Sequence, residues 1–411
     1  MKIFHTTITG LLILQLLGCS PPGEDSHDGI ESLGVPTVGQ PAGPRLSTAI
    51  DGTVVLSWLE ADDSGSTLWY SMLANDGWQP RQAVVSGKDM FVNWADLPAV
   101  VPVTDEHWVA HWLEMAGSLT YAYHVLLSQS FDGGQSWSEP IKPHTDNTPT
   151  EHGFVSLFPY DGNVAAIWLD GRKTGTEASD DPTKSGMTLR GATIDADGTL
   201  HREQLIDELI CDCCQTDVAI AASGPVAVYR DRTVNEIRDI FVARFIEENW
   251  QQGVPLNNDN WQIAGCPVNG PAIAANGSHV AAAWFSVPDQ KPAVQVKLSA
   301  DSGATFGAAV PIATDGSLGR VDTVILSDNS VVVSWLQSNG AGLASLMVRA
   351  ISRSGEPGPV SMINSSVPAR SAPQMALSGG KLIFVWTESH DSGSLIQSAR
   401  VPFESLPLAD H

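Results

Sequence analysis

One short apolar pattern recurs seven times along the chain and strongly limits what the chain can fold into. Each copy is a run of mostly β-branched or small residues that ends in an aromatic residue, as in the segment 54–58. The aromatic residues are Trp58, Trp112, Trp168, Tyr229, Trp284, Trp335 and Trp386, and successive ones lie 51 to 61 residues apart. Short β-type runs at this period are typical of a β-propeller, in which each repeat forms one blade. The pattern therefore predicts an all-β fold, a single β-propeller of seven four-stranded blades with the aromatic residues packed between them.

Each repeat has room for four strands, named A to D from the centre of the ring outwards. In the second repeat we expect them at 97–103, 107–113, 120–129 and 137–141. The seventh repeat lacks a strand D, because only ten residues follow Val401. We expect the segment 33–38 to fill that position, which would close the ring and protect an exposed strand edge. The propeller would then span 44–411 as one domain.

The N-terminal segment carries export signals. The apolar stretch 8–17 is too short to span a membrane as a mature helix, which is typical of a signal peptide. The segment 16–19, Leu-Leu-Gly-Cys, resembles the lipobox of bacterial lipoproteins. This resemblance implies that 1–18 is removed and that Cys19 is lipidated, so the membrane is reached through the lipid alone. We expect 19–43 to be a flexible tether and the protein to reside at the outer membrane, because Ser20 follows the cysteine.

Charge excludes one class of partner. Lys and Arg number 22 against 46 Asp and Glu, which gives a formal net charge of −24. Nucleic-acid binding depends on cationic side chains that release counterions from phosphates. We therefore expect no nucleic-acid partner, and we expect a monomer.

Two turn motifs fit the pattern S-x-D-x-G-x-[ST]-[WF]. Their residues are Ser130, Asp132, Gly134 and Trp137 in the first, and Ser299, Asp301, Gly303 and Phe306 in the second. The motifs resemble the Asp box of bacterial neuraminidase repeats, which occurs in sialidases and other Asp-box propellers. The resemblance implies a structural turn between strands C and D, in which the aspartate accepts hydrogen bonds. It also makes six blades, as in sialidases, the alternative to seven.

The catalytic pattern of sialidases is matched only in part. That family uses three arginines for the substrate carboxylate, a tyrosine nucleophile paired with a glutamate, and an acidic residue for proton transfer. Arg45 resembles the first arginine and Arg230 the second, whereas Gln215 or Thr216 stands where the family has glutamate. The last tyrosine is Tyr229, so a C-terminal tyrosine nucleophile is impossible. The resemblance thus leaves open whether the protein is an exo-α-sialidase-like glycoside hydrolase.

The D-to-A and B-to-C connections of a propeller lie on one face, and most candidate functional residues fall there. The candidate ligand-binding residues are Arg45, Arg172, Arg190, Arg230, Arg232, Arg238, Asn93, Asp96 and His152, and the candidate catalytic residues are Asp170, Asp231 and Glu151. Guanidinium groups bind carboxylates or sulfates bidentately, and crowded carboxyl groups can hold or deliver protons. We expect one pocket to collect Arg172, Arg190, Arg230, Asp170 and Asp231. The alternative is that these arginines form structural ion pairs.

Acidic residues form a column two positions after the repeated aromatic residue. The column comprises Glu60, Glu114, Asp170, Asp231 and Glu388. We expect it to line the mouth of the central channel on the same face, or to be a solvated acidic rim.

Four cysteines remain after Cys19, and they fall just before strand A of adjacent repeats: Cys211, Cys213, Cys214 and Cys266. In an exported protein the simplest expectation is a disulfide that joins Cys266 to one of the other three. The alternative is a soft metal ion, Cu(I) or Zn²⁺, with His144 or His152 as a further ligand. No other cofactor is expected.

The leading interpretation is a surface lipoprotein whose propeller binds, and in one version hydrolyses, an anionic glycan at the face with the D-to-A and B-to-C loops. The second is a non-catalytic binding or assembly module. The third is a periplasmic metal-handling protein that uses the cysteines.

Overall fold

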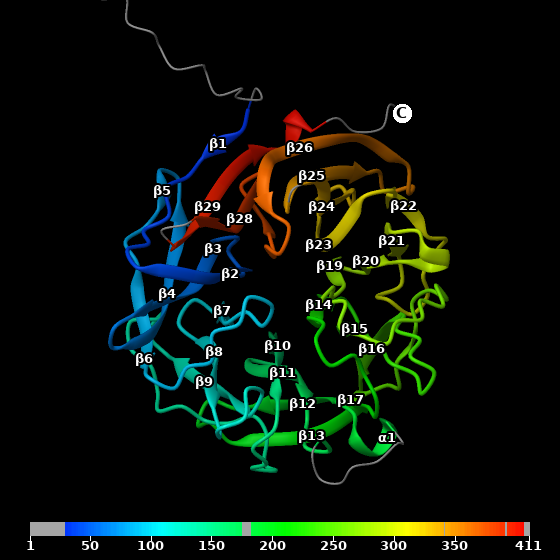
Figure 1. Cartoon of the computed structure of the whole chain (residues 1–411). Helices are drawn as coiled ribbons and strands as arrows, with labels where there is room; N and C mark the ends of the chain where they lie inside the picture. The colour runs from blue at the N-terminus through cyan, green and yellow to red at the C-terminus, as the bar shows by residue number, and fades with distance from the viewer. Residues whose placement is uncertain (1–28, 175–181, 341, 391–392, 407–411) are drawn as a thin grey trace, which may run out of the picture.

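The computed structural model describes residues 29–174, 182–340, 342–390 and 393–406. Seven antiparallel sheets stand around a central axis, as Figure 1 shows, so the predicted seven-bladed propeller is confirmed and six blades is wrong. The signal segment 1–18 and Cys19 lie outside the described residues. Within the described part of the chain, no helix is long and apolar enough to cross a membrane.

The first four blades follow the sequence order of the repeats. Blade 1 contains β2 (Gln40–Thr48), β3 (Val54–Asp62), β4 (Gly65–Ala74), β5 (Gly77–Trp78) and β6 (Gln82–Gly87). Blade 2 contains β7 (Ala99–Pro102), β8 (Trp108–Met115) and β9 (Tyr123–Ser130). Blade 3 contains β10 (His152–Tyr160), β11 (Asn163–Asp170), β12 (Thr188–Ile194) and β13 (Leu200–Asp207), with the short helix α1 (Pro182–Ser185) between β11 and β12. Blade 4 contains β14 (Asp217–Ala221), β15 (Gly224–Arg230), β16 (Ile240–Ile246), β17 (Asn249–Trp250) and β18 (Val254–Pro255).

The remaining blades complete the ring. Blade 5 contains β19 (Ala272–Asn276), β20 (His279–Ser286), β21 (Ala293–Ser299) and β22 (Val310–Ala313), with a 3₁₀ turn at Pro288–Gln290. Blade 6 contains β23 (Ser317–Ile325), β24 (Val331–Gly340), β25 (Leu343–Ile351) and β26 (Pro357–Pro368). Blade 7 contains β27 (Gln374–Ser378), β28 (Lys381–His390), β29 (Gly393–Pro402) and β1 (Glu31–Ser32), and a second 3₁₀ turn follows at Phe403–Ser405.

The innermost strands close a circle around the axis. Each of β2, β7, β10, β14, β19, β23 and β27 contacts the innermost strand of the next blade, and β27 contacts β2. The N-terminal strand β1 pairs with β29, and Leu33 donates its backbone N–H to the Ser398 carbonyl oxygen at 2.9 Å. The closing strand is therefore Glu31–Ser32, two residues before the segment 33–38 that the sequence suggested.

Blade 2 has only three strands among the described residues. The expected strand at 137–141 reduces to one bridge between Leu127 and Ile141. The chain from Ser130 to His152 instead runs as a long connection to blade 3. This blade lacks the outer strand whose hydrogen bonds hold the edge of the others.

The repeated aromatic residues form the core between blades, as predicted. Trp168 of blade 3, for example, is fully buried and packs in one cluster with Val109 and Val125 of blade 2. Burial of a large apolar side chain contributes roughly 2–3 kcal/mol, so seven such contacts stabilise the ring at every interface.

Two residues of the acidic column, Glu60 and Asp170, lie between the blades and not along the channel, which corrects the sequence-based expectation for these two. The indole Nε1–H of Trp58 donates to Glu60 at 2.9 Å, and that of Trp168 donates to Asp170 at 2.8 Å. Residues two apart on a strand share one face of the sheet, so these acids lie beside the indoles between the blades. They satisfy a buried N–H group that would otherwise be unpaired.

The two S-x-D-x-G turns have the same hydrogen bonds. Asp132 accepts bonds from the backbone N–H and hydroxyl of Ser136 at 2.8 and 2.5 Å, and Asp301 accepts the same pair from Thr305 at 2.8 and 2.6 Å. Because strands alternate in direction, these turns after strand C lie on the face opposite the D-to-A connections. We therefore interpret both turns as structural elements of the face opposite the D-to-A connections.

Candidate functional site

A cavity of about 150 Å³ opens where the innermost strands begin, at the end of the axis that carries the D-to-A connections. We call it the axial pocket, and its charged and amide lining comprises Arg45, Gln215, Asp217, Asn269, Arg320 and Asp322. Arg45 donates from Nη1 to the Val155 carbonyl oxygen at 3.2 Å, and burial lowers its pKa. Its guanidinium forms no ion pair with any described carboxylate.

Arg320 is the second cation of the axial pocket and has unused hydrogen-bond donors. Its backbone has a φ of 57° and donates its N–H to Asn269 Oδ1 at 2.7 Å, while its guanidinium lies 5.1 Å from the centre of the Trp94 ring. The Nε and Nη1 groups are buried and have no hydrogen-bond partner among the described residues. Burial of a cation without a counter-charge is costly, so this site favours an entering anion.

Three carboxyl groups surround the axis beside Arg45: Asp96 is buried, and Asp217 and Asp322 are half-buried. Each accepts the backbone N–H of the innermost strand of a neighbouring blade: Asp96 from Phe154 at 2.8 Å, Asp217 from Ile273 at 2.8 Å, and Asp322 from Met375 at 2.6 Å. Burial raises the pKa of Asp217 to about 6 and the pKa values of Asp96 and Asp322 to about 7. At a pH below these pKa values the three carboxyl groups are neutral. The guanidinium groups of Arg45 and Arg320 then give the pocket a positive charge.

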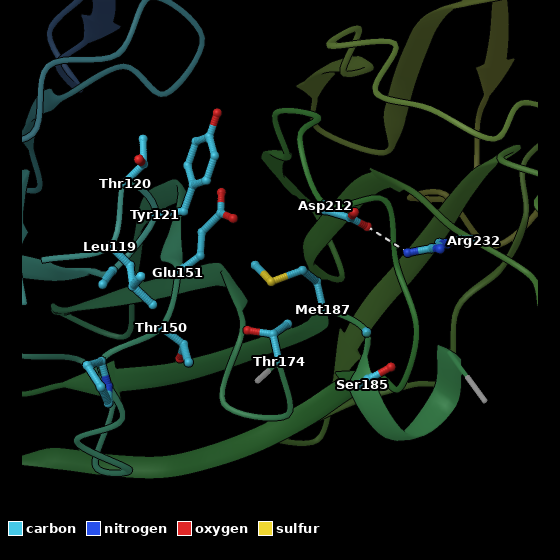
Figure 2. A pocket seen from close by; sticks show the side chains of 13 residues that line it. Leu119, Thr120, Tyr121, Thr150, Glu151, Thr174, Ser185, Met187, Asp212 and Arg232 are labelled. Carbon is cyan, nitrogen blue, oxygen red and sulfur yellow. Dashed lines mark hydrogen bonds and ion pairs between the residues drawn. The ribbon is translucent and has the colours of Figure 1, made fainter. Parts of the chain in front are cut away.

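A larger cavity of about 460 Å³ lies on the same face, and its walls come from D-to-A and B-to-C connections of blades 2, 3 and 4. In this rim pocket, Tyr121 and Glu151 stand on one side and Asp212 and Arg232 on the other (Figure 2). Tyr121 is 60% exposed. Arg232 donates to Asp212 at 3.1 Å.

Glu151 has an environment that favours its neutral form. Burial raises its pKa to about 7, and this effect outweighs the hydrogen bond that the Tyr123 hydroxyl donates to its Oε1 atom at 2.7 Å, which favours the ionised form. Asp212 lines the rim pocket while Gln215, three residues later, lines the axial pocket. One short segment of chain therefore runs from the rim pocket to the axial pocket.

Arg230 lines neither pocket, which corrects the expected convergence of five residues. It is 1% exposed and donates to backbone carbonyl oxygens: twice to Asn269 at 3.1 and 2.8 Å, and at 2.7 Å each to Arg238 and Phe285. Its guanidinium also lies 4.8 Å from the centre of the Trp261 ring. Asp231 is buried beside it, and burial raises its pKa to about 7, but no ion pair joins the two. Arg230 therefore joins blade 4 to blade 5.

Arg172, Arg190 and Asp170 do meet, but in an ion-pair network at the interface of blades 2 and 3. Arg172 binds Asp170 bidentately with two contacts of 2.7 Å, and both arginines bind Glu203, at 2.7 and 3.0 Å. Asp170 is fully buried and also accepts the Trp168 indole. Arg172, Asp170 and Glu203 pair with one another, whereas Nε of Arg190 has no hydrogen-bond partner among the described residues. This network favours the structural role that was the alternative expectation.

Two more of the candidate ligand-binding residues, Arg238 and Asn93, form hydrogen bonds with nearby groups of the protein. Arg238 is 3% exposed and donates to Glu236 and to the sulfur of Cys211, at 2.8 and 3.2 Å. Asn93 accepts the backbone N–H of Ala95 at 2.9 Å and shapes its own loop.

The connection that enters blade 4 gathers three thiols, which we call the thiol cluster. Cys211 Sγ lies 3.3 Å from Cys214 Sγ and 3.9 Å from Cys213 Sγ, whereas a disulfide bond measures about 2.05 Å. All four described cysteines are free, so the expected bridge to Cys266 is not formed. Hydrogen bonds from the Cys213 and Cys214 thiols, and the charge of a nearby arginine, hold the pKa of Cys211 well below its usual value.

The sequence-based reasoning missed Arg320. A weak signal existed in strand A. Arg45 of β2 is paired with Ser57, just before Trp58, and Asp322 of β23 is paired with Ser334, just before Trp335, so Arg320 lies two residues before the position equivalent to Arg45. The comparison of strand B pointed instead to Arg230.

Comparisons with known proteins place the chain by its fold. No protein-family model matches it, and no curated protein matches its sequence. A protein of unknown function from Dyadobacter fermentans has a TM-score of 0.51 at 13% identity, with 91% of this chain and 99% of that chain covered. The NanB sialidase from Streptococcus pneumoniae has a TM-score of 0.48 at 9% identity, with 86% of this chain and 84% of that chain covered. An ulvan lyase, which is a polysaccharide lyase, has a TM-score of 0.44 at 9% identity, with 79% of each chain covered.

At these identities the likeness concerns the fold alone. The Dyadobacter protein matches over nearly the whole chain, which supports the propeller architecture. The fold and site together define a seven-bladed β-propeller with an axial pocket on one face that is lined by two arginines and two aspartates.

Proposed function

We propose that the protein binds an anionic glycan at the face with the D-to-A and B-to-C connections, with a carboxylate or sulfate group of the glycan in the axial pocket. The observation that carries this proposal is Arg320, whose buried Nε and Nη1 donors have no partner among the described residues. Charge-assisted hydrogen bonds to an anion would satisfy these donors. Arg45 lines the same pocket and adds a second positive charge.

The rim pocket would hold neighbouring sugar units of the same glycan. Asp212 of the rim pocket lies three residues before Gln215 of the axial pocket, so one short segment of chain connects the two pockets. Exposed Tyr121 offers an aromatic face, and Glu151, Asp212 and Arg232 offer polar groups. Pockets that combine an aromatic surface with a few polar groups are typical of small-molecule sites.

The test is a titration of the purified chain with three oligosaccharides of equal length: one neutral, one with uronic acids and one sulfated. We expect the anionic pair to bind and the neutral one to bind at least tenfold more weakly, a difference of about 1.4 kcal/mol. Arg320→Met should remove this preference. Arg353→Met changes an exposed arginine on the opposite face and is the matched control.

Equal binding of all three sugars by the parent chain, or an unchanged preference in Arg320→Met, would refute the proposal. Binding of no sugar would favour the assembly module. A panel of fluorogenic glycosides that includes a sialoside decides whether a bound glycan is cleaved.

A second candidate function is metal handling by the thiol cluster, favoured by the separations of 3.3 and 3.9 Å between its unbonded sulfur atoms. Sulfur ligands at about 2.3 Å from a tetrahedral zinc ion lie roughly 3.8 Å apart. Soft thiolates select Cu(I) or Zn²⁺. Under reducing conditions the thiol cluster should take up one Cu(I) ion, and Cys213→Ser should weaken the binding of this Cu(I) ion.

Export and lipidation remain part of the proposed function and rest on the segment 16–19. Mass spectrometry of the N-terminal peptide from the native host should find acyl chains on Cys19. Cys19→Ala should release the protein from the membrane fraction.

A further inference from the structure

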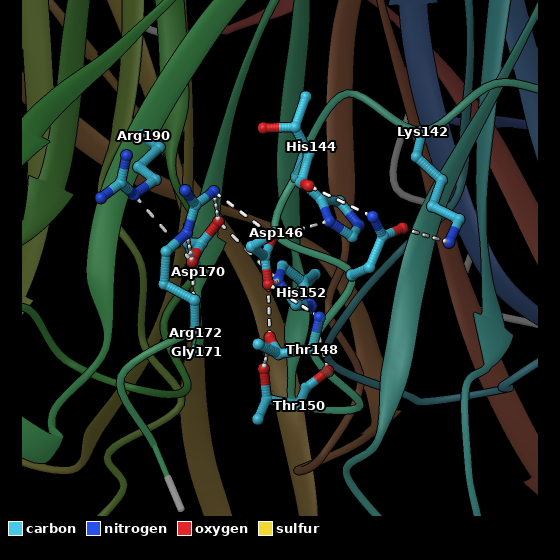
Figure 3. A network of polar contacts seen from close by, with 12 residues as sticks. Lys142, His144, Asp146, Thr148, Thr150, His152, Asp170, Gly171, Arg172 and Arg190 are labelled. Carbon is cyan, nitrogen blue, oxygen red and sulfur yellow. Dashed lines mark hydrogen bonds and ion pairs between the residues drawn. The ribbon is translucent and has the colours of Figure 1, made fainter. Parts of the chain in front are cut away.

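Three histidines meet at the interface of blades 2 and 3, apart from both pockets. His124 lies in β9, His144 in the connection between the blades, and His152 at the start of β10 (Figure 3 shows the last two). The rings of His144 and His152 stack with centres 3.8 Å apart, and the ring of His124 lies 5.0 and 5.6 Å from them. We call this set the histidine cluster.

Each ring presents a buried nitrogen that makes no hydrogen bond. These atoms are Nδ1 of His124, Nε2 of His144 and Nε2 of His152. His144 is 2% exposed and His152 is fully buried. Buried polar atoms in native proteins nearly always have a partner, so three unpaired nitrogens in one place call for an explanation.

The other nitrogen of the two buried rings is held in place. Nδ1 of His144 lies 3.0 Å from Asp146 Oδ1, and Nδ1 of His152 lies 3.0 Å from the Thr150 carbonyl oxygen. A carbonyl oxygen only accepts, so the proton of His152 sits on Nδ1, and the carboxylate favours the same form in His144. In the neutral form, with the proton on Nδ1, both rings present a lone pair at Nε2. That of His152 faces the carboxylates of Asp146 and Asp170, at 3.2 and 3.8 Å. Metal-bound histidines are typically oriented in this way, by a carboxylate or carbonyl on the second nitrogen.

Asp146 supplies a carboxylate beside the nitrogens. Its Oδ2 atom lies 3.2 Å from Nε2 of His152 and also accepts the backbone N–H of Thr148 at 3.1 Å. Arg172 is 3.5 Å from Asp146 but only 2.7 Å from Asp170 and Glu203, so its charge is mainly taken up elsewhere. Lys142 is the other cation near the cluster, and it acts on His124 at longer range.

We propose that His124, His144, His152 and Asp146 bind a divalent transition-metal ion of the Zn²⁺ type that joins blades 2 and 3. One nitrogen from each histidine lies within 4.8 Å of the others. Tetrahedral zinc with Zn–N distances of 2.0–2.1 Å needs roughly 3.3 Å between ligands, so the nitrogens would have to close by up to about 1.5 Å. The rings of His144 and His152, which stack at an interplanar angle of 7°, would also have to rotate so that both lone pairs point at one ion. Three imidazoles and one carboxylate suit Zn²⁺ rather than Ca²⁺ or Mg²⁺, which prefer oxygen.

The position explains why a metal would be useful there. Blade 2 has no outer strand among the described residues. The long connection to blade 3 is tied to β9 by separate contacts, such as the bridge between Leu127 and Ile141 and the hydrogen bond from the Ser138 N–H to the Gln129 carbonyl oxygen. An ion bound by β9, by this connection and by β10 would join all three segments. Four protein ligands leave no open position, which is typical of a structural zinc site.

The test uses the whole exported chain, stripped of metal with a chelator and then given one equivalent of Zn²⁺ or Co²⁺. Zn²⁺ affinity is measured by competition with a chromophoric chelator. We expect one bound ion, a higher Tm, and a tetrahedral Co²⁺ spectrum without a sulfur charge-transfer band. The last feature distinguishes the histidine cluster from the thiol cluster.

Variants locate the ion. His144→Gln should weaken Zn²⁺ binding about 100-fold or more and abolish the rise in Tm, and His124→Gln, at the partly exposed ring, repeats the test if the first variant folds poorly. His111→Gln removes another fully buried histidine outside the cluster and should bind Zn²⁺ as the parent does. Cys213→Ser should also leave this ion in place.

The proposal is overturned if the stripped chain takes up no Zn²⁺, if the Co²⁺ spectrum is dominated by sulfur, or if both His144→Gln and His124→Gln bind Zn²⁺ like the parent chain. In the first case the cluster is a purely polar contact between His152 and Asp146. The proposed glycan site depends on Arg45 and Arg320 in the axial pocket, and none of these variants changes either arginine. The metal test and the glycan test can therefore fail independently of each other.

Discussion

The guanidinium of Arg230 donates two hydrogen bonds to the backbone carbonyl oxygen of Asn269, at 3.1 and 2.8 Å. Asn269 belongs to the connection that enters blade 5, and its side chain in turn accepts the backbone N–H of Arg320. One arginine therefore holds the loop that positions the other. The buried arginine is structural, and the partly exposed one faces the axial pocket.

Arg230→Met should destabilise the fold and spare the ligand site. The substitution leaves the carbonyl oxygens of Asn269, Arg238 and Phe285 without their donor, and each buried unpaired group costs about 1–3 kcal/mol. We expect a loss of about 3 kcal/mol or more in the free energy of unfolding, measured by urea titration. Normal stability combined with lost glycan binding would contradict this role.

Asp170→Asn should also act on stability. The substitution removes the charge that binds Arg172 bidentately in a fully buried position, and breaking a buried pair costs about 3–5 kcal/mol. Glu203 still contacts Arg172, so we expect the lower end of that range. If Asp170 were instead a catalytic acid or base, the variant would keep its Tm and lose any glycosidase activity, which a paired thermal and kinetic assay would reveal.

Asp132→Ala and Asp301→Ala should each lower the Tm without changing glycan affinity. Each aspartate organises its turn by accepting two bonds from one residue, and the turns lie on the face opposite the pockets. Differential scanning calorimetry and a glycan titration on the same preparations check both parts. A large loss of affinity at unchanged Tm would mean that the assignment of faces is wrong.

The carboxyl groups beside the axis predict a pH-dependent stability. Burial raises the pKa of Asp322 to about 7, whereas an unfolded aspartate titrates near 3.9. The folded chain binds this proton more tightly, so the contribution of Asp322 to the unfolding free energy falls as pH rises from about 4 to 7. Asn cannot ionise, so Asp322→Asn should gain stability relative to the parent chain across that window.

Urea titrations at several pH values between 4 and 8 measure this difference. Asp217→Asn should also gain stability relative to the parent chain, but only between about pH 4 and pH 6, because burial raises the pKa of Asp217 only to about 6. A difference between variant and parent that does not change with pH would show that neither carboxyl group titrates as described.

The number of blades, the order of the strands and the sorting of loops between two faces follow from the sequence alone. The reason is that an aromatic residue every 51 to 61 positions and the alternation of antiparallel strands are local patterns that repeat. The closing strand was placed within two residues, at 33–38 rather than Glu31–Ser32, because an edge position needs only a short extended segment.

Only the tertiary structure decided which charged residues face a ligand. Arg230 and Arg320 look alike in sequence, yet the first ends a strand B between two blades and is enclosed by carbonyl oxygens, while the second stands on an innermost strand beside the axis. The unpaired nitrogens of His124, His144 and His152 likewise depend on the meeting of β9, a long connection and β10. Burial and pairing arise from contacts between distant segments, and no local pattern in the chain encodes them.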